Sequence, residues 1–254
     1  MIRFDKVTKR LGSRNVLDDF DLEIRPGETY VICGPSGMGK SVTLKHMVRL
    51  LTPDSGRVLV GDDCVSEARG KDLEKIRSRF GVLFQGGALL AWLSAGENVA
   101  LPLREHTSMG DSEIEKLVRE KLRLVELEDA YDKYPADLSG GMRKRVALAR
   151  AIITQPEIIL YDEPTSGLDP VTSRTIDDMI DNLRKQLGVT SVVVTHDLHS
   201  ALAIGTRIAM LHNGKAVEVS APDEFVRSKN EVVRGFLEAQ YITRRGEWEE
   251  DMKI

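Results

Sequence analysis

Short runs of apolar, often β-branched residues alternate along the chain with longer segments in which apolar residues recur every three or four positions. The short runs predict strands and the longer segments predict helices, because a helix returns to the same face after about 3.6 residues whereas a strand alternates between faces. This alternation predicts an α/β fold with a largely parallel sheet. The expected strands are residues 2–7, 20–24, 29–33, 81–84, 158–161, 191–195, 207–211 and 215–219.

The pattern also predicts how the chain is divided. Strand signals vanish between residues 85 and 155, where apolar positions such as Ile114, Val118 and Leu122 have helical spacing. We therefore expect a single domain in which a helical segment is inserted into a sheet core. Its expected parts are a core of residues 1–86 and 156–220, a helical subdomain of residues 87–155 and a C-terminal helical extension of residues 221–254.

Two further local signals lie in the last quarter of the chain. Asn213-Gly214 separates the last two expected strands and predicts a tight hairpin. Residues 244–251 are rich in charge, so this tail is either frayed or an interaction arm.

Composition narrows the function classes. With 36 Lys and Arg against 40 Asp and Glu, the net charge of −4 offers no general basic surface, and we expect no nucleic-acid partner. No apolar run approaches the roughly 18 to 20 residues that cross a bilayer. Asp5 interrupts the start of the chain, so a secretory signal is not expected and the cytoplasm is the expected compartment. Cys33 and Cys64 lack metal-ligand spacing and are interpreted as structural.

A glycine-rich segment follows the expected strand 29–33 and precedes an expected helix over residues 42–51. It matches the phosphate-loop pattern G-x-x-x-x-G-K-[ST], in which backbone N–H groups and the positive helix end face phosphate. A plain helix-capping turn would explain the glycines but not the Lys-Ser pair that ends the motif. In this interpretation Lys40 reaches the β and γ phosphates and Ser41 coordinates Mg²⁺. The expected nucleotide-binding residues are Gly34, Pro35, Ser36, Gly37, Met38, Gly39, Lys40, Ser41 and Val42.

A second chemical signal is the apolar strand 158–161, which ends in two adjacent carboxylates, Asp162 and Glu163. Ligands of open α/β sheets lie at this end of the strands, and a cation can offset the desolvation of a carboxylate there. Asp162 then suits the outer coordination sphere of Mg²⁺, and Glu163 suits a general base that deprotonates the attacking water. An acidic turn would be the simpler interpretation of this pair alone.

The segment Leu138-Ser139-Gly140-Gly141-Met142, ahead of an expected long helix, makes the chain resemble the nucleotide-binding subunits of ABC transporters. Their signature is usually LSGGQ, so Met142 departs from it at one position. A helix N-terminus at Ser139 can take the γ-phosphate from the side opposite the first loop. A serine N-cap would explain Ser139, but glycine inside a helix start lowers helix stability, so Gly140 and Gly141 indicate another use.

The resemblance implies the remaining site residues. Gln85 matches the Q-loop glutamine that contacts Mg²⁺ and water, and His196 matches the switch histidine that senses the γ-phosphate. Asp169 matches the D-loop, although Asp169-Pro170 could also be an ordinary N-cap with proline at the first helical position. The family usually stacks adenine on an aromatic residue, and here Leu11 occupies that place beside Arg10, so adenine and guanine are both left open.

Family resemblance further implies a fold and an assembly. The fold is a P-loop NTPase (RecA-like) core with an N-terminal antiparallel β subdomain and an inserted α-helical subdomain. Two copies pair head to tail around ATP and Mg²⁺, and hydrolysis separates them. Apolar residues 87–93 lie where transporters of this family seat a helix of their membrane permease.

Residues 84–89 and 97–103, around and after the Q-loop, together with the Met142 signature look like the Mla-type ATPases that serve MCE-protein lipid transporters. This implies a peripheral subunit on the cytoplasmic face of the inner membrane that energises phospholipid movement. Its partners would be a permease dimer, an MCE-type lipid-binding protein and a small regulatory subunit, with residues 236–254 available to steady the dimer. The alternatives are the ATPase of a polar-solute importer, such as one for an amino acid, and a soluble ABC ATPase without a permease.

Overall fold

The computed structural model describes residues 1–240, which fall into two compact units. Of these residues, unit 1 combines 1–66 with 194–240, and unit 2 comprises 67–193. The charged segment 244–251 lies outside the described residues. In residues 1–240 no helix combines the length and the apolar character needed to cross a membrane. The three-part division expected from the sequence stays a prediction.

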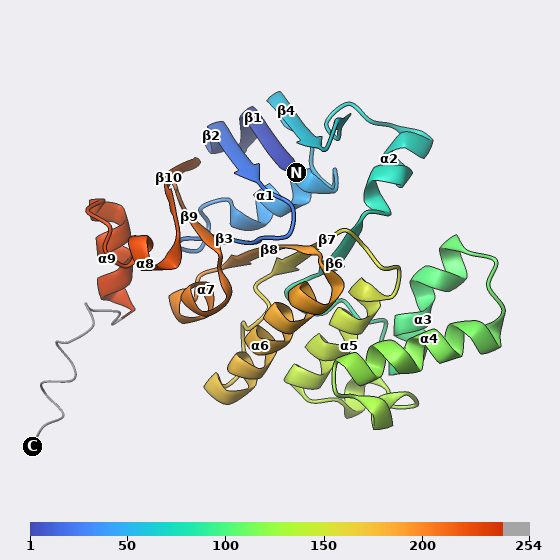
Figure 1. Cartoon of the computed structure of the whole chain (residues 1–254). Coiled ribbons are helices and arrows are strands. Elements are labelled where there is room, and N and C mark those ends of the chain that lie inside the picture. The colour runs from blue at the N-terminus through green and yellow to red at the C-terminus, as the bar shows by residue number, and fades with distance from the viewer. Residues whose placement is uncertain (241–254) are drawn as a thin grey trace, which may run out of the picture. The chain divides into compact units, whose positions relative to one another are not determined.

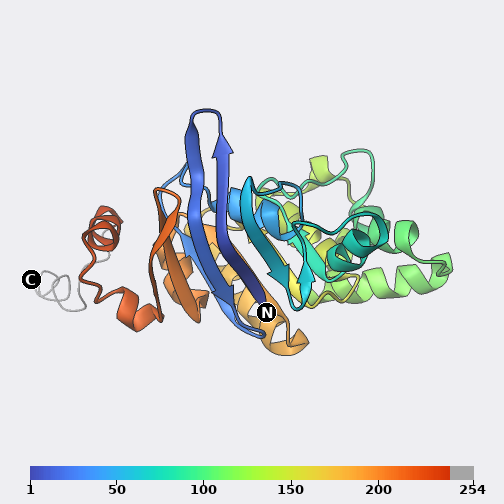
Figure 2. The same ribbon diagram turned by 90° about the horizontal axis from the view of Figure 1, so that it is seen from above.

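Unit 1 contains an antiparallel sheet in the order β2-β1-β4-β5. Its strands are β1 (Ile2–Leu11), β2 (Arg14–Ile24), β4 (Ser55–Val60) and β5 (Asp63–Cys64). Figure 2 shows β1 and β2 as a long hairpin flanked by β4. Alternate side chains are buried where β1, β2 and β4 pair at residues 2–4, 20–24 and 58–60, and the rings of Phe4 and Phe20 meet edge to face at 5.6 Å.

Unit 1 also carries three strands in the order β10-β9-β3. They are β3 (Thr29–Cys33), which is buried throughout, β9 (Arg207–His212), which runs parallel to it, and β10 (Lys215–Ser220), which is antiparallel to β9. Asn213 and Gly214 both have positive φ, of 47° and 77°, so the predicted tight hairpin is confirmed. The helices of this unit are α1 (Lys40–Met47), α7 (Leu198–Ile204), α8 (Pro222–Phe225) and α9 (Glu231–Ala239).

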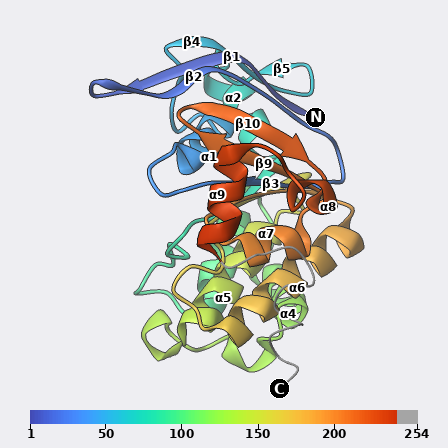
Figure 3. The ribbon, with the colours of Figure 1, turned by 90° about the vertical axis from the view of Figure 1, so that its left-hand side faces the viewer.

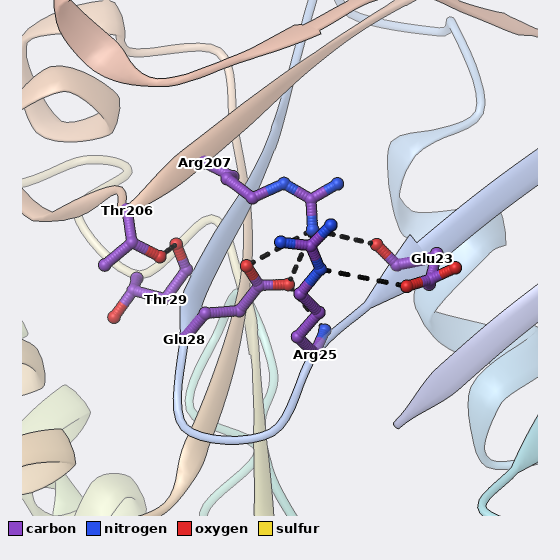
Figure 4. A network of polar contacts seen from close by, with 6 residues as sticks. All are labelled: Glu23, Arg25, Glu28, Thr29, Thr206 and Arg207. Carbon is purple, nitrogen blue, oxygen red and sulfur yellow. Dashed lines mark hydrogen bonds and ion pairs between the residues drawn. The ribbon is translucent and has the colours of Figure 1, made fainter.

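A polar network fixes the turn that leads from β2 into β3 (Figure 4). The Arg207 guanidinium donates to both carboxylate oxygens of Glu28, at 3.1 and 3.3 Å, and to the Glu23 carbonyl at 3.3 Å. The same guanidinium lies 5.0 Å from the centre of the Tyr30 ring. The Thr206 hydroxyl donates to the Thr29 carbonyl at 3.0 Å. These contacts anchor β3 at its start, and the glycine-rich loop follows at its end.

Unit 2 contains β6, β7 and the first four residues of β8, in the order β8-β7-β6. The strands β6 (Phe80–Leu83) and β7 (Ile158–Asp162) are parallel, and β8 (Thr190–Thr195) follows α6. The helices are α2 (Gly70–Arg77), α3 (Ala95–His106), α4 (Asp111–Leu124), α5 (Gly140–Ile152) and α6 (Pro170–Leu187), with short 3-10 turns at Glu128–Ala130 and Pro135–Asp137.

The helical periodicity predicted for the middle of the chain is present in unit 2. Figure 1 shows α3, α4 and α5 together in green, and α4 buries Ile114, Val118 and Leu122 along one face. Tyr131 lies so close to Gly96 that a Cβ there would be 2.7 Å from its ring, so glycine is needed for this approach. Between residues 84 and 157, all of which the structure describes, there is no strand.

Some predicted bounds were wrong. The strands β1 and β2 extend to Leu11 and back to Arg14, beyond the expected 2–7 and 20–24. Their outer halves form an exposed hairpin tip with shifts of register, so they lack the apolar alternation that predicts a strand. The helix after the glycine-rich loop is Lys40–Met47 rather than 42–51. The strands β4 and β5 were not predicted, because β4 starts with three exposed residues, Ser-Gly-Arg.

Candidate functional site

The glycine-rich loop joins the buried strand β3 to α1 and depends on glycine at both ends. Gly34 has φ 147°, and a Cβ there would lie 2.5 Å from the Leu211 carbonyl oxygen. Gly39 is the N-cap of α1 with φ 98°, and a Cβ there would lie 2.8 Å from the Val16 carbonyl oxygen. Both positions therefore need glycine, because their φ is positive and because a Cβ would collide with a backbone carbonyl.

The loop concentrates positive potential. Since Gly39 has no side chain to cap α1 and the first turn holds no acidic residue, the positive end of the helix is not offset by a local carboxylate. Lys40 is buried, and its Nζ donates to the carbonyls of Gly34 at 2.8 Å and Pro35 at 3.2 Å. Ser41 and Val42 follow in the same first turn. This arrangement suits an anion at the loop.

The predicted structural role of Cys33 agrees with its surroundings. Its side chain is fully buried at the end of β3, and burial raises the pKa of the thiol to about 12. Cys33 is therefore an uncharged packing residue behind the loop.

The tip of the β1–β2 hairpin lies beside the glycine-rich loop. Leu11 pairs with Arg14 across the hairpin, and the Arg14 Nη2 lies 3.5 Å from the Met38 sulfur and 3.4 Å from the Asn213 amide oxygen. Leu11 is 45% exposed, and the Arg10 Nε donates to the Gly12 carbonyl at 3.1 Å. The structure thus brings Leu11 and the loop together through Arg14, a residue that the sequence patterns did not single out.

His196 follows β8 in unit 1, and its side chain is exposed. The next residue, Asp197, is the N-cap of α7 and accepts the N–H groups of His199 and Ser200. The His196 carbonyl accepts a hydrogen bond from the Gln240 amide at 2.7 Å. The histidine is therefore on a short loop with fixed backbone at both sides.

The two carboxylates in unit 2 end the buried strand β7. Asp162 is half-buried as its last residue, while Glu163 is 8% exposed and adopts φ 50°, which is strained for a non-glycine residue. The Ser166 N–H donates to the Glu163 carbonyl at 3.2 Å and closes a tight turn.

Lys144, from α5, holds this turn. Its Nζ donates to the carbonyls of Glu163 at 3.0 Å and Ser166 at 2.8 Å. Burial lowers the pKa of Lys144 to about 8, and the Glu163 carboxylate opposes this shift. The signal for this contact was a lysine within a helix whose other residues are mostly buried. The partners of Lys144 could not be identified, because they are backbone carbonyls and no motif specifies them.

The signature segment begins α5. Ser139 is the N-cap and its hydroxyl accepts the Met142 N–H at 3.2 Å, so the N-cap role left open from the sequence is present. A Cβ at Gly141 would lie 2.5 Å from Thr172 Cγ2 of α6. Close packing of α5 on α6 is therefore a structural reason for glycine at position 141, in addition to the predicted anion contact. Gly140 has room for a Cβ at an ordinary contact distance.

Asp169 is likewise an N-cap. Its carboxylate accepts the N–H groups of Val171 and Thr172, both at 3.0 Å, and the Thr172 hydroxyl, with Pro170 at the first helical position of α6. The hydroxyl of Thr172 is the main cause of its lowered pKa, so the side chain is a carboxylate. The alternative role that the sequence allowed for Asp169 is therefore realised.

Gln85 is exposed and follows β6, at the start of a loop that α5 also holds. The Gly87 N–H donates to the Phe84 carbonyl at 2.8 Å. Arg150 of α5 donates to the carbonyls of Gly87 at 2.7 Å and Ala88 at 2.8 Å. Unit 2 thus joins the helix of Ser139 to both the Glu163 turn and the Gln85 loop, while Lys40 and His196 belong to unit 1.

Comparison with known proteins identifies these features. The profile of the family described as "ABC transporter" matches residues 17–166, which include the glycine-rich loop, the signature and both carboxylates. The chain belongs to the ABC transporter family.

Relatives of this ABC protein include subunits named for different transported substrates. The probable ribonucleotide transport ATP-binding protein mkl of Mycobacterium leprae is 42% identical over 96% of this chain and 70% of the relative. The intermembrane phospholipid transport system ATP-binding protein MlaF of Haemophilus influenzae is 35% identical over 94% of this chain and 91% of MlaF. The methionine import ATP-binding protein MetN of Xanthomonas euvesicatoria is 38% identical over 95% of this chain and 74% of MetN.

Among solved structures, the dimeric post-hydrolysis state of the ATP-binding cassette MJ0796 bound to ADP and Pi has a TM-score of 0.80 at 36% identity. The match covers 87% of this chain and 99% of MJ0796. The predicted ABC fold is confirmed, and the chain is an ATPase subunit of an ABC transporter whose substrate is ATP with Mg²⁺.

The donor chemistry of this ABC ATPase fits Mg²⁺. The Ser41 hydroxyl at the start of α1 and the Asp162 carboxylate at the end of β7 each offer oxygen, the donor type that Mg²⁺ prefers. Across residues 1–240 no three His, Cys, Asp or Glu side chains gather as a metal site. A Mg²⁺ ion held by few protein oxygens completes its shell with phosphate oxygens and water, as nucleotide-bound Mg²⁺ does.

Proposed function

We propose that the chain is the ATPase of a transporter that moves phospholipid, or a related lipid, between bacterial envelope membranes. The observation that carries this proposal is the match to MlaF, which spans 91% of a protein named for intermembrane phospholipid transport. The expected position is the cytoplasmic face of the inner membrane. The expected partners are a permease dimer, an MCE-type lipid-binding protein and a small regulatory subunit.

In the proposed mechanism Lys40 and the N–H groups of residues 34–41 hold the phosphates of ATP, while Ser41, Asp162 and Gln85 hold Mg²⁺, which neutralises charge on the phosphates when bound. Glu163 orients and deprotonates the attacking water, and His196 contacts the γ-phosphate. Leu11 packs against the purine ring of the nucleotide.

Assembly completes the site in this proposal. Two copies pair with C2 symmetry, so that Ser139, Gly140, Gly141 and Asp169 of one subunit face the ATP held by the other. The dimeric form of MJ0796 supports this arrangement, because it is a cassette of 36% identity that was solved as a dimer with ADP and Pi. Release of phosphate then removes the charge that both subunits contact.

A surface for the permease is available in unit 2 near Gln85. Trp92 is 73% exposed and Phe84 is 38% exposed. Tyr134 is 48% exposed, and the segment before it is bonded to the start of α3 through the Ala95 N–H and the Lys133 carbonyl at 2.8 Å. Exposed aromatic side chains of this kind mark interaction surfaces.

The central experiment replaces Glu163 by Gln, which keeps the size of the side chain and removes the base. We expect at least a hundredfold loss of hydrolysis and a stable ATP-bound dimer in gel filtration with light scattering. Glu224→Gln, an exposed change of the same kind, is the matched control. A Glu163→Gln protein that still hydrolyses ATP, or that stays monomeric with ATP, would contradict the scheme.

The transported substrate needs its own test because MetN, named for methionine import, is 38% identical to the chain. The second candidate is therefore the ATPase of an amino-acid importer. We expect the complex purified from detergent extracts to carry phospholipid identifiable by mass spectrometry, and its ATPase rate to respond to lipid. A complex that contains a solute-binding protein and responds to an amino acid would favour the importer.

A further inference from the structure

A side chain at the far end of the described chain holds the backbone on both sides of Asp197. Gln240 follows the last residue of α9, and its Nε2 donates to the His196 carbonyl at 2.7 Å. Its Oε1 accepts the Leu198 N–H at 2.9 Å. One planar amide therefore uses its donor on the residue before Asp197 and its acceptor on the residue after it.

The second of these bonds fills a gap in the capping of α7. Asp197 accepts the N–H groups of His199 and Ser200, the second and third residues of the helix. The N–H of Leu198, the first helical residue, has no partner within a helix and is not reached by this cap. Gln240 accepts it, so the start of α7 is capped by two side chains from different parts of the chain.

The position of Gln240 is set by α9, which is bonded to the rest of unit 1 at both of its ends. Asn230 is the N-cap of α9, and its Nδ2 donates to the Val217 carbonyl of β10 at 3.1 Å. Val233 and Leu237 are buried on one face of the helix. Figure 3 shows α9 extending from the β9–β10 hairpin toward α7, and the Gln240 contacts complete this path.

We propose that Gln240 is a positioning residue for His196, holding the loop that presents the imidazole to the γ-phosphate. The inference rests on the proposed function of His196. A displacement of about 1 Å in a group that contacts the reacting atoms can cost about a hundredfold in rate. Each hydrogen bond to the His196 loop restricts such a displacement. Through α9, the rate of ATP hydrolysis depends on contacts made on β10, away from the nucleotide.

Three variants test this role. Gln240→Ala removes both bonds, whereas Gln240→Glu keeps an acceptor for Leu198 and replaces the donor to the His196 carbonyl by a second carboxylate oxygen. We expect kcat to fall about three- to tenfold in both, with KM for ATP within about twofold, because each bond is of ordinary strength and lies outside the nucleotide contacts. Glu238→Ala, which alters an exposed side chain of α9, is the control and should match the wild type.

The double variant Gln240→Ala/His196→Ala separates positioning from general stability. We expect His196→Ala to lower kcat and the added Gln240→Ala to lower it no further, because a residue that acts through His196 has no effect without it. Additive losses would overturn the inference, as would a normal kcat in Gln240→Glu. If His196→Ala itself hydrolyses ATP normally, the proposed function of His196 fails instead.

A loss of folding is recognised independently. Thermal unfolding and circular dichroism of Gln240→Ala and Gln240→Glu are compared with Glu238→Ala. Should Gln240→Ala unfold α9, Gln240→Glu, which keeps the Leu198 contact, still decides: a normal kcat overturns the inference, and a selective fall in kcat at an unchanged melting temperature supports it.

Discussion

Replacing Lys144 by Met tests whether α5 controls the turn at Glu163, the proposed general base. Met keeps an unbranched side chain of similar length and has no N–H donor. The change leaves the carbonyls of Glu163 and Ser166 without the ammonium that now contacts them at 3.0 and 2.8 Å. Since Glu163 holds a strained φ of 50°, loss of this support should let the turn relax away from its present conformation.

Two effects on stability oppose each other. Two hydrogen bonds from a charged donor contribute roughly 3 to 6 kcal/mol together. Burial lowers the pKa of Lys144 from 10.5 to about 8, so removing the charge returns about 3 kcal/mol. We therefore expect the free energy of unfolding to change by only about 0 to 3 kcal/mol, so the variant stays folded. Hydrolysis should nevertheless fall about ten- to a hundredfold, because the carboxylate of Glu163 loses its position.

The assay measures kcat, KM for ATP and urea unfolding for Lys144→Met, with Lys144→Arg as the charged variant and Lys116→Met on the exposed face of α4 as control. A kcat of Lys144→Met within twofold of the wild type would refute the role of this contact. A loss of several kcal/mol in stability without a selective loss of kcat would show that Lys144 serves the fold alone.

The pH dependence gives a second, independent measurement. Below about pH 8 Lys144 is charged in both states, whereas between the folded pKa of about 8 and the unfolded value of 10.5 the unfolded chain binds more protons. Wild-type stability should therefore rise with pH relative to Lys144→Met, by about 2 kcal/mol between roughly pH 7 and pH 9.5. Parallel stability curves for the two proteins would contradict the buried charge.

Two more predictions concern unit 1. Gly34→Ala should abolish ATP binding measured by calorimetry, or prevent folding measured by circular dichroism, because its Cβ would lie 2.5 Å from the Leu211 carbonyl oxygen; normal binding would disprove the need for glycine there. Leu11→Tyr adds an aromatic ring to a position that is 45% exposed and should lower KM for ATP about five- to tenfold, through stacking that is typically about 1 to 3 kcal/mol. An unchanged KM would indicate that the purine ring of the nucleotide does not contact residue 11.

The sequence predicted the elements that are defined by burial alone. β3 was predicted with its observed bounds because its five residues are all buried. They are of apolar, aromatic or β-branched types, which are typical of strands. β4 was missed because its first three residues are exposed, and its pairing with β1 joins segments about fifty residues apart, which local patterns do not record.

The candidate site shows the same division. Lys40, Asp162 and Glu163 could be proposed from the sequence, and placed at the ends of β3 and β7, because the motifs that contain them are made of neighbours in the chain. Lys144 and Gln240 could not, because their partners are carbonyl and N–H groups 19 to 44 residues away, and a backbone group has no residue type to recognise.

Lys144 and Arg150, two of the cations of α5, are six positions apart, about 9 Å along a helix. Lys144 contacts the Glu163 turn and Arg150 contacts the loop after Gln85, so one helix is hydrogen-bonded to both loops. Neither loop can then be reshaped by mutation or by a docked partner without straining its counterpart. Swapping α5 between relatives should accordingly disturb catalysis and partner response together, even when every signature residue is retained.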